Sequence, residues 1–196
     1  MQSKLSHRTR LRALALAVPA AAIALVALGS GAAGADTAAP PAGAKVDVVH
    51  IELVKGALKF VAPESVDQGD YLEVVNETNP KQVGPHTFSL VTKGSVPKTK
   101  AARQKCFTPN HICFAIAKWH GVKGEGPPSI NPAEAGPEGW STMGNLHKKG
   151  DSWFTGEKPK ASIVQQVSAT AGQTIYFMCA IHPWMHGRIQ VLPAGS

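Results

Sequence analysis

Three residues near the C-terminus have the chemistry of metal ligands. Cys179, His182 and Met185 stand three positions apart, directly after the apolar segment 174–178. A thiolate, an imidazole and a thioether together favour soft or borderline metal ions. One further imidazole would complete a His₂Cys set with a weak axial methionine, which is typical of electron-transfer copper sites. His86 is the best candidate, because it directly precedes another strand-like segment.

The loop that begins at Cys179 resembles the ligand loop of the cupredoxins, the blue copper proteins. Its short Cys-x-x-His-x-x-Met spacing, with a proline and an aromatic residue between the histidine and the methionine, is most similar to amicyanin. Plastocyanins have a longer gap between these two residues. Upstream, Asn76 and the run of Gly84, Pro85 and His86 are similar to the segment that carries the first histidine ligand of the family.

This resemblance implies a ligand set. His86, Cys179 and His182 would be the equatorial ligands of one type 1 copper ion, and Met185 would be the axial ligand. Each residue alone would more often be core filler or a loop residue, but the four together favour copper. The implied function is a carrier that shuttles single electrons between a redox-protein donor and acceptor through Cu(II) and Cu(I).

The resemblance also implies supporting and docking roles. Thr87, which follows the first histidine, is expected to brace the ligand loop. His182 would be the partly exposed ligand through which electrons leave. Pro183 and Trp184 beside it would form an apolar docking patch for the redox partner.

Short segments rich in β-branched and aromatic residues must position these ligands. They predict seven strands, bounded by turn residues, at 46–54, 58–61, 71–75, 87–92, 163–167, 174–178 and 189–192. Many short strands with turn signals predict an all-β fold, a Greek-key sandwich or barrel. This agrees with the cupredoxin resemblance, which covers about residues 44–92 and 160–193.

Residues 93–160 lose the strand pattern and have no counterpart in the resemblance. The stretch is rich in Lys, Gly and Pro, with one candidate helix at 112–119. We therefore expect one cupredoxin domain over residues 45–196, interrupted by a long, mostly irregular insertion at 93–160.

Residues 1–35 are predicted to be a secretory signal peptide. They begin with basic residues, continue with an apolar run at 13–28 and end in a small-x-small pattern. The run of 16 residues is shorter than the ~20 that a spanning helix needs, although a retained anchor stays the alternative. The protein would then be exported to the periplasm, the cell surface or the medium, with residues 36–44 as a flexible linker and without stable membrane insertion.

The charge of the chain argues against a nucleic-acid partner. The whole sequence carries a net charge of +7, but four of its 20 basic residues and none of its 13 acidic residues lie in 1–35, which leaves +3 for the rest. Much of the apparent basicity therefore belongs to the signal segment, and a nucleic-acid interface loses its main support.

The cysteines allow two interpretations. An exported chain with three cysteines leaves one unpaired, so Cys106 and Cys113 are expected to form a disulfide and Cys179 to remain for copper. The alternative is a zinc site formed by Cys106, His111, Cys113 and His120.

Other functions stay open at this point. An enzymatic role is not expected, because the sequence has no second Cys-x-x-His loop of the kind that multicopper enzymes use. Copper storage, delivery or sensing in the cell envelope is the main alternative to electron transfer. Met143 and His147, in the insertion, would be candidates for a second copper site.

Overall fold

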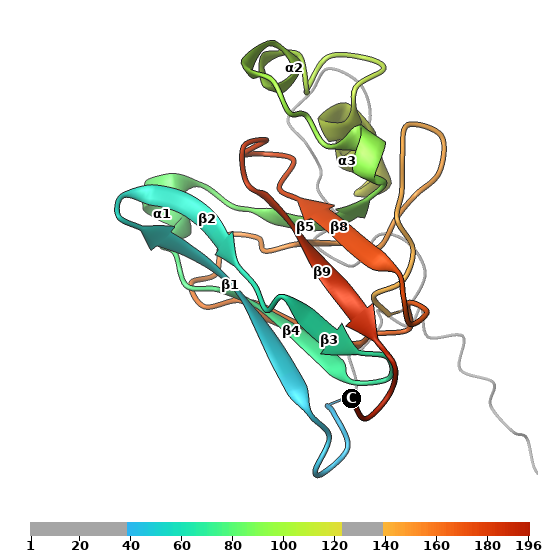
Figure 1. Cartoon of the computed structure of the whole chain (residues 1–196). Helices are drawn as coiled ribbons and strands as arrows, with labels where there is room; N and C mark the ends of the chain where they lie inside the picture. Colours follow the sequence, from blue (N-terminus) through green and yellow to red (C-terminus); the bar gives the residue numbers. More distant parts are fainter. Residues whose placement is uncertain (1–38, 123–138) are drawn as a thin grey trace, which may run out of the picture. The chain divides into compact units, whose positions relative to one another are not determined.

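The computed structural model describes residues 39–122 and 139–196 (Figure 1). The predicted signal peptide, residues 1–35, lies outside the described residues, as does the first part of the predicted linker. Within the described part of the chain, no helix is both long enough and apolar enough to cross a bilayer.

Two β-sheets make up the core of the fold. One has the strand order β2-β1-β4-β7 and the other the order β3-β9-β8-β5-β6. The first sheet consists of Ala57–Val61 (β2), Val46–Val54 (β1), Tyr71–Asn76 (β4) and Ser162–Gln166 (β7). The second consists of Ser65–Asp67 (β3), His186–Leu192 (β9), Thr174–Met178 (β8), Thr87–Val91 (β5) and Ser152–Phe154 (β6).

The main hydrophobic core lies between these two sheets. It draws Val49, Leu72 and Ile163 from the first sheet and Phe88 and Phe177 from the second. The Phe88 ring contacts those of Phe60, Trp140 and Phe177, with centroids 4.7 to 5.7 Å apart. Burial of alternate strand residues against a facing sheet is what makes a sandwich stable.

Helical segments follow β5 and cover the outer face of the second sheet. They are Lys93–Ser95 (η1), Lys100–Gln104 (α2) and Ile112–Trp119 (α3); a short helix, Pro80–Val83 (α1), precedes β5. The apolar residues of α3, including Ile116, pack with Val91 of β5 and Met178 of β8 in a second cluster. Successive strand residues point to opposite faces, so β5 and β8 each contribute to both cores.

The all-β, two-sheet fold that the sequence predicts is confirmed, and all seven predicted strands are present. The predicted helix at 112–119 is also present, as α3. Two strands of three residues each, β3 and β6, were not predicted, because such short segments show no alternation. The insertion is mostly irregular in its described part, as predicted, although it also contains η1, α2 and β6, which were not predicted.

Candidate metal centre

The pairing of β5 with β8 brings two distant segments of the chain to one end of the second sheet. These strands are antiparallel, with Ser89 opposite Met178. The start of β5 and the end of β8 therefore lie together. His86 directly precedes β5 and Cys179 directly follows β8, so the sheet itself brings the two residues close.

His86 is held in place through both its backbone and its ring. Its backbone N–H donates to Thr155 Oγ1 at 3.0 Å, and its carbonyl accepts from the Thr155 N–H at 3.0 Å. Its ring Nε2 lies 3.1 Å from Thr78 Oγ1, and that hydroxyl donates to Asn76 Oδ1 at 2.7 Å. Because the Thr78 proton is already committed to Asn76, Nε2 must be the donor to Thr78. This tautomer leaves the Nδ1 lone pair for a metal ion.

Short hydrogen bonds fix the ligand loop after β8. The Cys179 N–H donates to the Met185 carbonyl at 2.9 Å, and the Met185 N–H donates to the His182 carbonyl at 2.8 Å. Cys179 Sγ accepts hydrogen bonds from the backbone N–H groups of His182, at 3.3 Å, and Thr87, at 3.4 Å. These donors favour the thiolate form that a metal ion needs.

Three donor atoms form a triangle at this end of the sheet. His86 Nδ1 and His182 Nδ1 are 3.1 Å apart, and Cys179 Sγ lies 3.7 Å from the second and 4.0 Å from the first. A triangle with these sides has a point about 2.1 Å from each corner, which is close to a metal–nitrogen or metal–sulfur bond length. Among the described residues this is the one group of three histidine, cysteine or acidic side chains that could hold a metal ion.

Burial controls the protonation of these donors. Burial, together with a smaller contribution from the neighbouring His182, lowers the pKa of His86 from 6.5 to about 4. Burial also lowers the pKa of His182, against a hydrogen bond with the Val83 backbone that raises it. The pKa of the Cys179 thiol is raised by burial, while hydrogen bonds from Thr87 and His182 act in the opposite direction. Both imidazoles are therefore neutral at pH 7, as metal binding requires.

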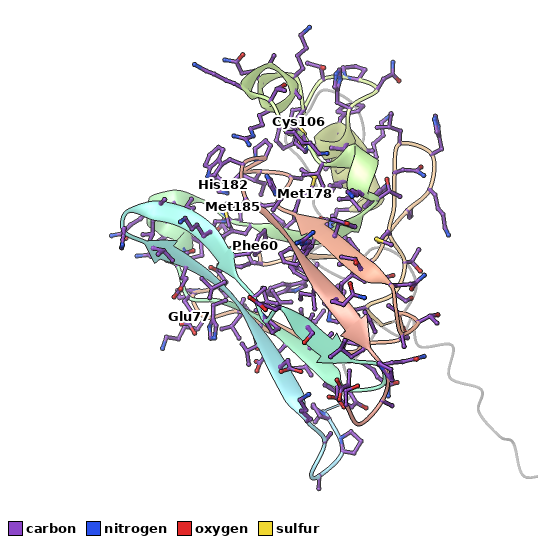
Figure 2. The ribbon with its side chains drawn as sticks, in the orientation of Figure 1. Phe60, Glu77, Cys106, Met178, His182 and Met185 are labelled. Atoms are coloured by element: carbon purple, nitrogen blue, oxygen red, sulfur yellow. A yellow bond between two sulfur atoms is a disulfide. The ribbon has the colours of Figure 1, made fainter. Side chains whose placement is uncertain are left out.

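The remaining predicted site residues lie around this triangle. Met185 is only 2% exposed, and its backbone N–H bonds to the carbonyl of His182 in the same loop, where Figure 2 labels both residues. Thr87 Oγ1 accepts the N–H of Ala180 at 2.8 Å, which ties the start of β5 to the ligand loop. Trp184 is 50% exposed, and its ring meets that of His182 edge to face at 5.1 Å. Pro183 is buried, so the expectation that it adds to an exposed docking patch is wrong.

Sequence reasoning did not assign a role to Thr155 or Thr78. Thr155 lies 69 positions from His86, in the segment expected to be irregular, and only the pairing of β6 with β5 brings it near. Thr78 follows Asn76 by two residues and acts through the His86 ring. The sequence shows only a threonine near a strand in each case; that both are buried, so that each hydroxyl needs a partner, is known from the structure.

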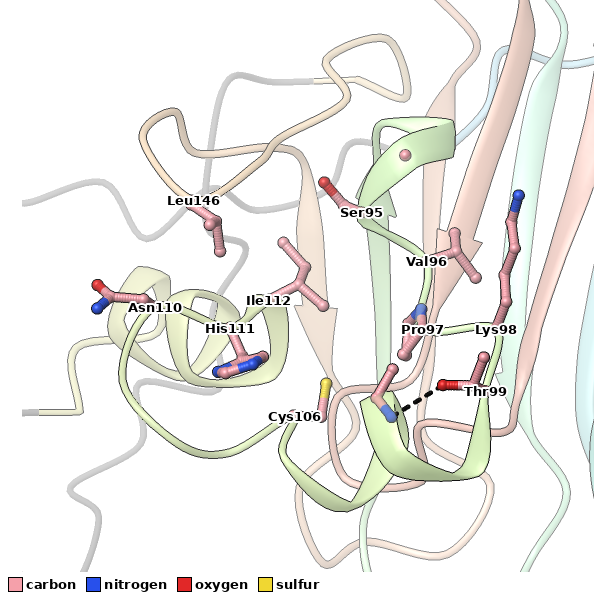
Figure 3. A pocket seen from close by; sticks show the side chains of 12 residues that line it. Ser95, Val96, Pro97, Lys98, Thr99, Cys106, Asn110, His111, Ile112 and Leu146 are labelled. Atoms are coloured by element: carbon pink, nitrogen blue, oxygen red, sulfur yellow. Dashed lines mark hydrogen bonds between the residues drawn. The ribbon is translucent and has the colours of Figure 1, made fainter.

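The zinc alternative is wrong. Cys106 and Cys113 form a disulfide, as the disulfide interpretation predicts. Cys106 and His111 both line a surface pocket of about 410 Å³ (Figure 3), but the Cys106 sulfur is already bonded to Cys113. The His120 ring is buried, with Nε2 2.7 Å from Ser152 Oγ. A sulfur in a disulfide is no thiolate ligand.

A second copper site at Met143 and His147, considered above as a possibility, also finds no support in the packing. Met143 packs against the core between the sheets, whereas His147 is exposed in the following loop. The two side chains therefore lie in different environments.

Comparisons with known proteins give distant structural neighbours. No protein-family model matches the chain, and no curated protein matches it. The chain is similar to the solved structure of amicyanin from Paracoccus versutus, with 18% identity over 81% of this chain and 88% of that one and a TM-score of 0.30.

Two auracyanins are also similar to the chain. Auracyanin from Roseiflexus castenholzii is 16% identical over 77% of this chain and 100% of that one, with a TM-score of 0.37. Auracyanin A, a "blue" copper protein from Chloroflexus aurantiacus, is 14% identical over 76% and 99%, with a TM-score of 0.39. With values this low, the function of the chain has to follow from its own donor atoms.

Proposed function

We propose that this chain is an exported blue copper protein that carries single electrons between two redox partners. The observation that carries the proposal is the buried triangle formed by His86 Nδ1, His182 Nδ1 and Cys179 Sγ. Two imidazoles and one thiolate, with a long axial bond to methionine, are the ligands of electron-transfer copper sites. Met185, buried in the same loop, would be the axial ligand.

A copper ion held by these residues would supply a one-electron couple between Cu(II) and Cu(I). The chain contributes donors that are in place beforehand. Thr78 and Thr155 orient His86, and two backbone N–H groups hold the sulfur of Cys179. Because the partners of each ligand fix its position, the donors have little need to move when the charge changes.

Burial of the donors favours a carrier over an enzyme. His86 and Cys179 are fully buried, and Met185 is nearly so. A substrate would have to displace packed protein to reach them. An electron needs no such opening, and His182 is only partly buried.

The surface near His182 is the proposed route for electrons. The His182 ring contacts the half-exposed ring of Trp184. An exposed aromatic side chain offers apolar contact area to a partner protein, and weak redox encounters use small interfaces. We propose that donor and acceptor proteins dock over Trp184.

Loading the purified protein with Cu(II) tests this function. We expect an intense visible thiolate-to-copper absorption band that a reductant bleaches reversibly. Cys179→Ala should abolish the band, because the thiolate makes the strong in-plane bond. Met185→Leu should retain the band and shift the reduction potential, because the thioether makes only a weak axial bond.

The matched control for the loss of a cysteine is the pair Cys106→Ala and Cys113→Ala, which should keep the band. A Cys179→Ala protein that is still blue would overturn the site assignment. A wild-type protein that binds Cu(I) tightly but shows no such band with Cu(II) would favour the alternative, copper storage or delivery.

A further inference from the structure

Hydroxyl side chains line the outer face of β5, directly behind the metal centre. Thr87 and Ser89 point to this face, while Phe88 and Leu90, between and after them, point into the core between the sheets. Ser152 of β6 lies opposite Ser89 in the sheet. None of the three hydroxyl residues is more than 4% exposed. Buried hydroxyls need hydrogen-bond partners, and here they find one another.

These hydroxyls form a continuous chain that ends on a histidine of the insertion. Ser89 Oγ donates to Thr87 Oγ1 at 3.0 Å, and Ser89 Oγ and Ser152 Oγ are 2.7 Å apart. Ser152 Oγ lies 2.7 Å from His120 Nε2. His120 is the C-cap of α3 and is 3% exposed.

The direction of the chain is fixed. The Ser89 proton is committed to Thr87, so Ser89 must accept its hydrogen bond from Ser152. The Ser152 proton is then committed to Ser89, so Ser152 must accept from an N–H at His120 Nε2. Every donor in the chain therefore points from the insertion toward Thr87.

At Thr87 the chain reaches the metal ligand. A hydroxyl has two lone pairs and one proton. Thr87 Oγ1 uses both lone pairs, one for Ser89 Oγ and one for the Ala180 N–H, so the Thr87 side chain is held between the chain of hydroxyls and the ligand loop. The backbone N–H of this same residue donates to Cys179 Sγ at 3.4 Å, so the chain of hydroxyls fixes a residue that bonds to the metal ligand.

We infer that His120 is a positioning residue that acts through Ser152, Ser89 and Thr87 to hold the Thr87 backbone N–H on the Cys179 sulfur and so raise the reduction potential of the centre. The inference rests on the proposed copper function. A hydrogen bond withdraws charge from the thiolate, which favours Cu(I) over Cu(II). Hydrogen bonds in series strengthen one another, so the distant imidazole helps to hold Thr87, and with it the N–H that bonds to the sulfur.

The insertion is built to hold His120 rigidly at the far end of this chain. The packing of α3 on Val91 and Met178 fixes its axis. The Cys106–Cys113 disulfide anchors the first turn of α3 to the preceding loop. The insertion thereby reaches the metal ligand without contributing a ligand of its own.

Reduction potentials of copper-loaded variants test this inference. Ser89→Ala cuts the chain, and His120→Phe removes its first donor while keeping a ring. We expect each to shift the balance toward Cu(II) by about tenfold, which corresponds to about 59 mV for one electron. The double variant should shift no further than Ser89→Ala alone, because both changes break the same chain.

Two further variants serve as controls. His120→Gln keeps an N–H donor and should restore part of the potential. Ser95→Ala removes a hydroxyl of the insertion that bonds to Thr92, outside this chain of hydroxyls, and should leave the potential unchanged. If Ser89→Ala folds, is blue and keeps the wild-type potential, the inference is overturned. This holds even if His120→Phe fails to fold. A wild-type protein without a thiolate-to-copper band would count against the proposed function instead.

Discussion

The ligands and the groups that orient them come from different regions of the molecule. The three donors belong to the two-sheet sandwich: His86 and Cys179 stand at strand ends, and His182 lies in the loop between β8 and β9. Two of their supports, Thr155 and the chain that starts at His120, come from the insertion. A short spacing pattern in the sequence can therefore define the ligands, while a separate region of the chain supplies hydrogen-bond partners that orient them.

The two regions also differ in how they are packed. Between the sheets, aromatic rings such as Phe88 and Phe177 meet at van der Waals distance. Outside the second sheet, the insertion combines an apolar cluster around a disulfide with buried polar groups, among them Asp151, which is 0% exposed. Burying a polar group costs free energy unless the group has a hydrogen-bond partner. We therefore expect the stability of the insertion to depend more on pH than the stability of the apolar core between the sheets.

Asp151 gives the largest expected effect. Burial raises its pKa from 3.8 to about 6, against hydrogen bonds from the N–H groups of Ser141 and Thr142. The folded state therefore holds a proton that the unfolded state has lost, and the stability that this proton provides disappears as the pH rises from about 4 to 6. The free energy of unfolding should fall by about 3 kcal/mol across this window from Asp151 alone.

Urea unfolding of the metal-free protein and of Asp151→Asn, at intervals from pH 4 to 8, measures this effect. The difference between the two proteins should change between pH 4 and 6 and stay constant above. His86, whose lowered pKa acts in the opposite direction, is present in both and cancels in the difference. A difference that is constant over the whole range would mean that the Asp151 carboxylate stays charged in the folded insertion.

The ligand set could be predicted from sequence because its signals are local. Cys179, His182 and Met185 occupy one loop, and the strand after His86 and the strand before Cys179 have strong β-branched or aromatic composition. The strand β8 was predicted with its observed bounds, which places Cys179 at a strand end.

The supports could not be predicted because they depend on long-range pairing. Ser89 and Ser152 are 63 positions apart, and the three-residue strand that carries Ser152 shows no periodicity. The sequence does carry a trace of the chain, since hydroxyl residues alternate with Phe88 and Leu90 in a strand that proved to be buried on both faces. Burial on both faces is known only once α3 has been placed over the sheet.

The disulfide gives the second-largest effect and tests whether the two regions unfold together. Replacing Cys106 and Cys113 by alanine should lower the free energy of unfolding by about 2.5 kcal/mol, the chain-entropy value for so short a loop. Denaturation should be followed by tryptophan fluorescence and, in copper-loaded protein, by the thiolate-to-copper band.

A single transition by both probes would mean that the insertion and the sandwich form one cooperative unit, as the packing of Ile116 on Val91 and Met178 predicts. If the fluorescence changed before the band was lost, the insertion would be a separate unit. In that case the two regions would differ in their unfolding as well as in their packing.

Trp184 gives the smallest expected effect on stability and decides which region faces the partner. Its side chain is 50% exposed, so Trp184→Ala should lower the free energy of unfolding by about 1 kcal/mol or less and leave the copper spectrum nearly unchanged. Electron self-exchange between oxidised and reduced copies should slow severalfold, because an apolar contact beside His182 is lost. Leu53→Ala, at a residue that is 52% exposed on β1, is the matched control and should change neither property.

Phe107→Ala makes the same test on the insertion. Phe107 is 48% exposed and lines a pocket together with Ala180 and Ile181 of the ligand loop. If this variant exchanges electrons at the wild-type rate, docking is confined to the ligand loop. If its self-exchange slows as much as that of Trp184→Ala, the docking face extends onto the insertion.

Trp184→Ala could instead lose copper, or unfold with the ~3–5 kcal/mol penalty of an emptied core site. Trp184 would then be a core residue that supports the ligand loop. The docking face would then have to be sought around Phe107.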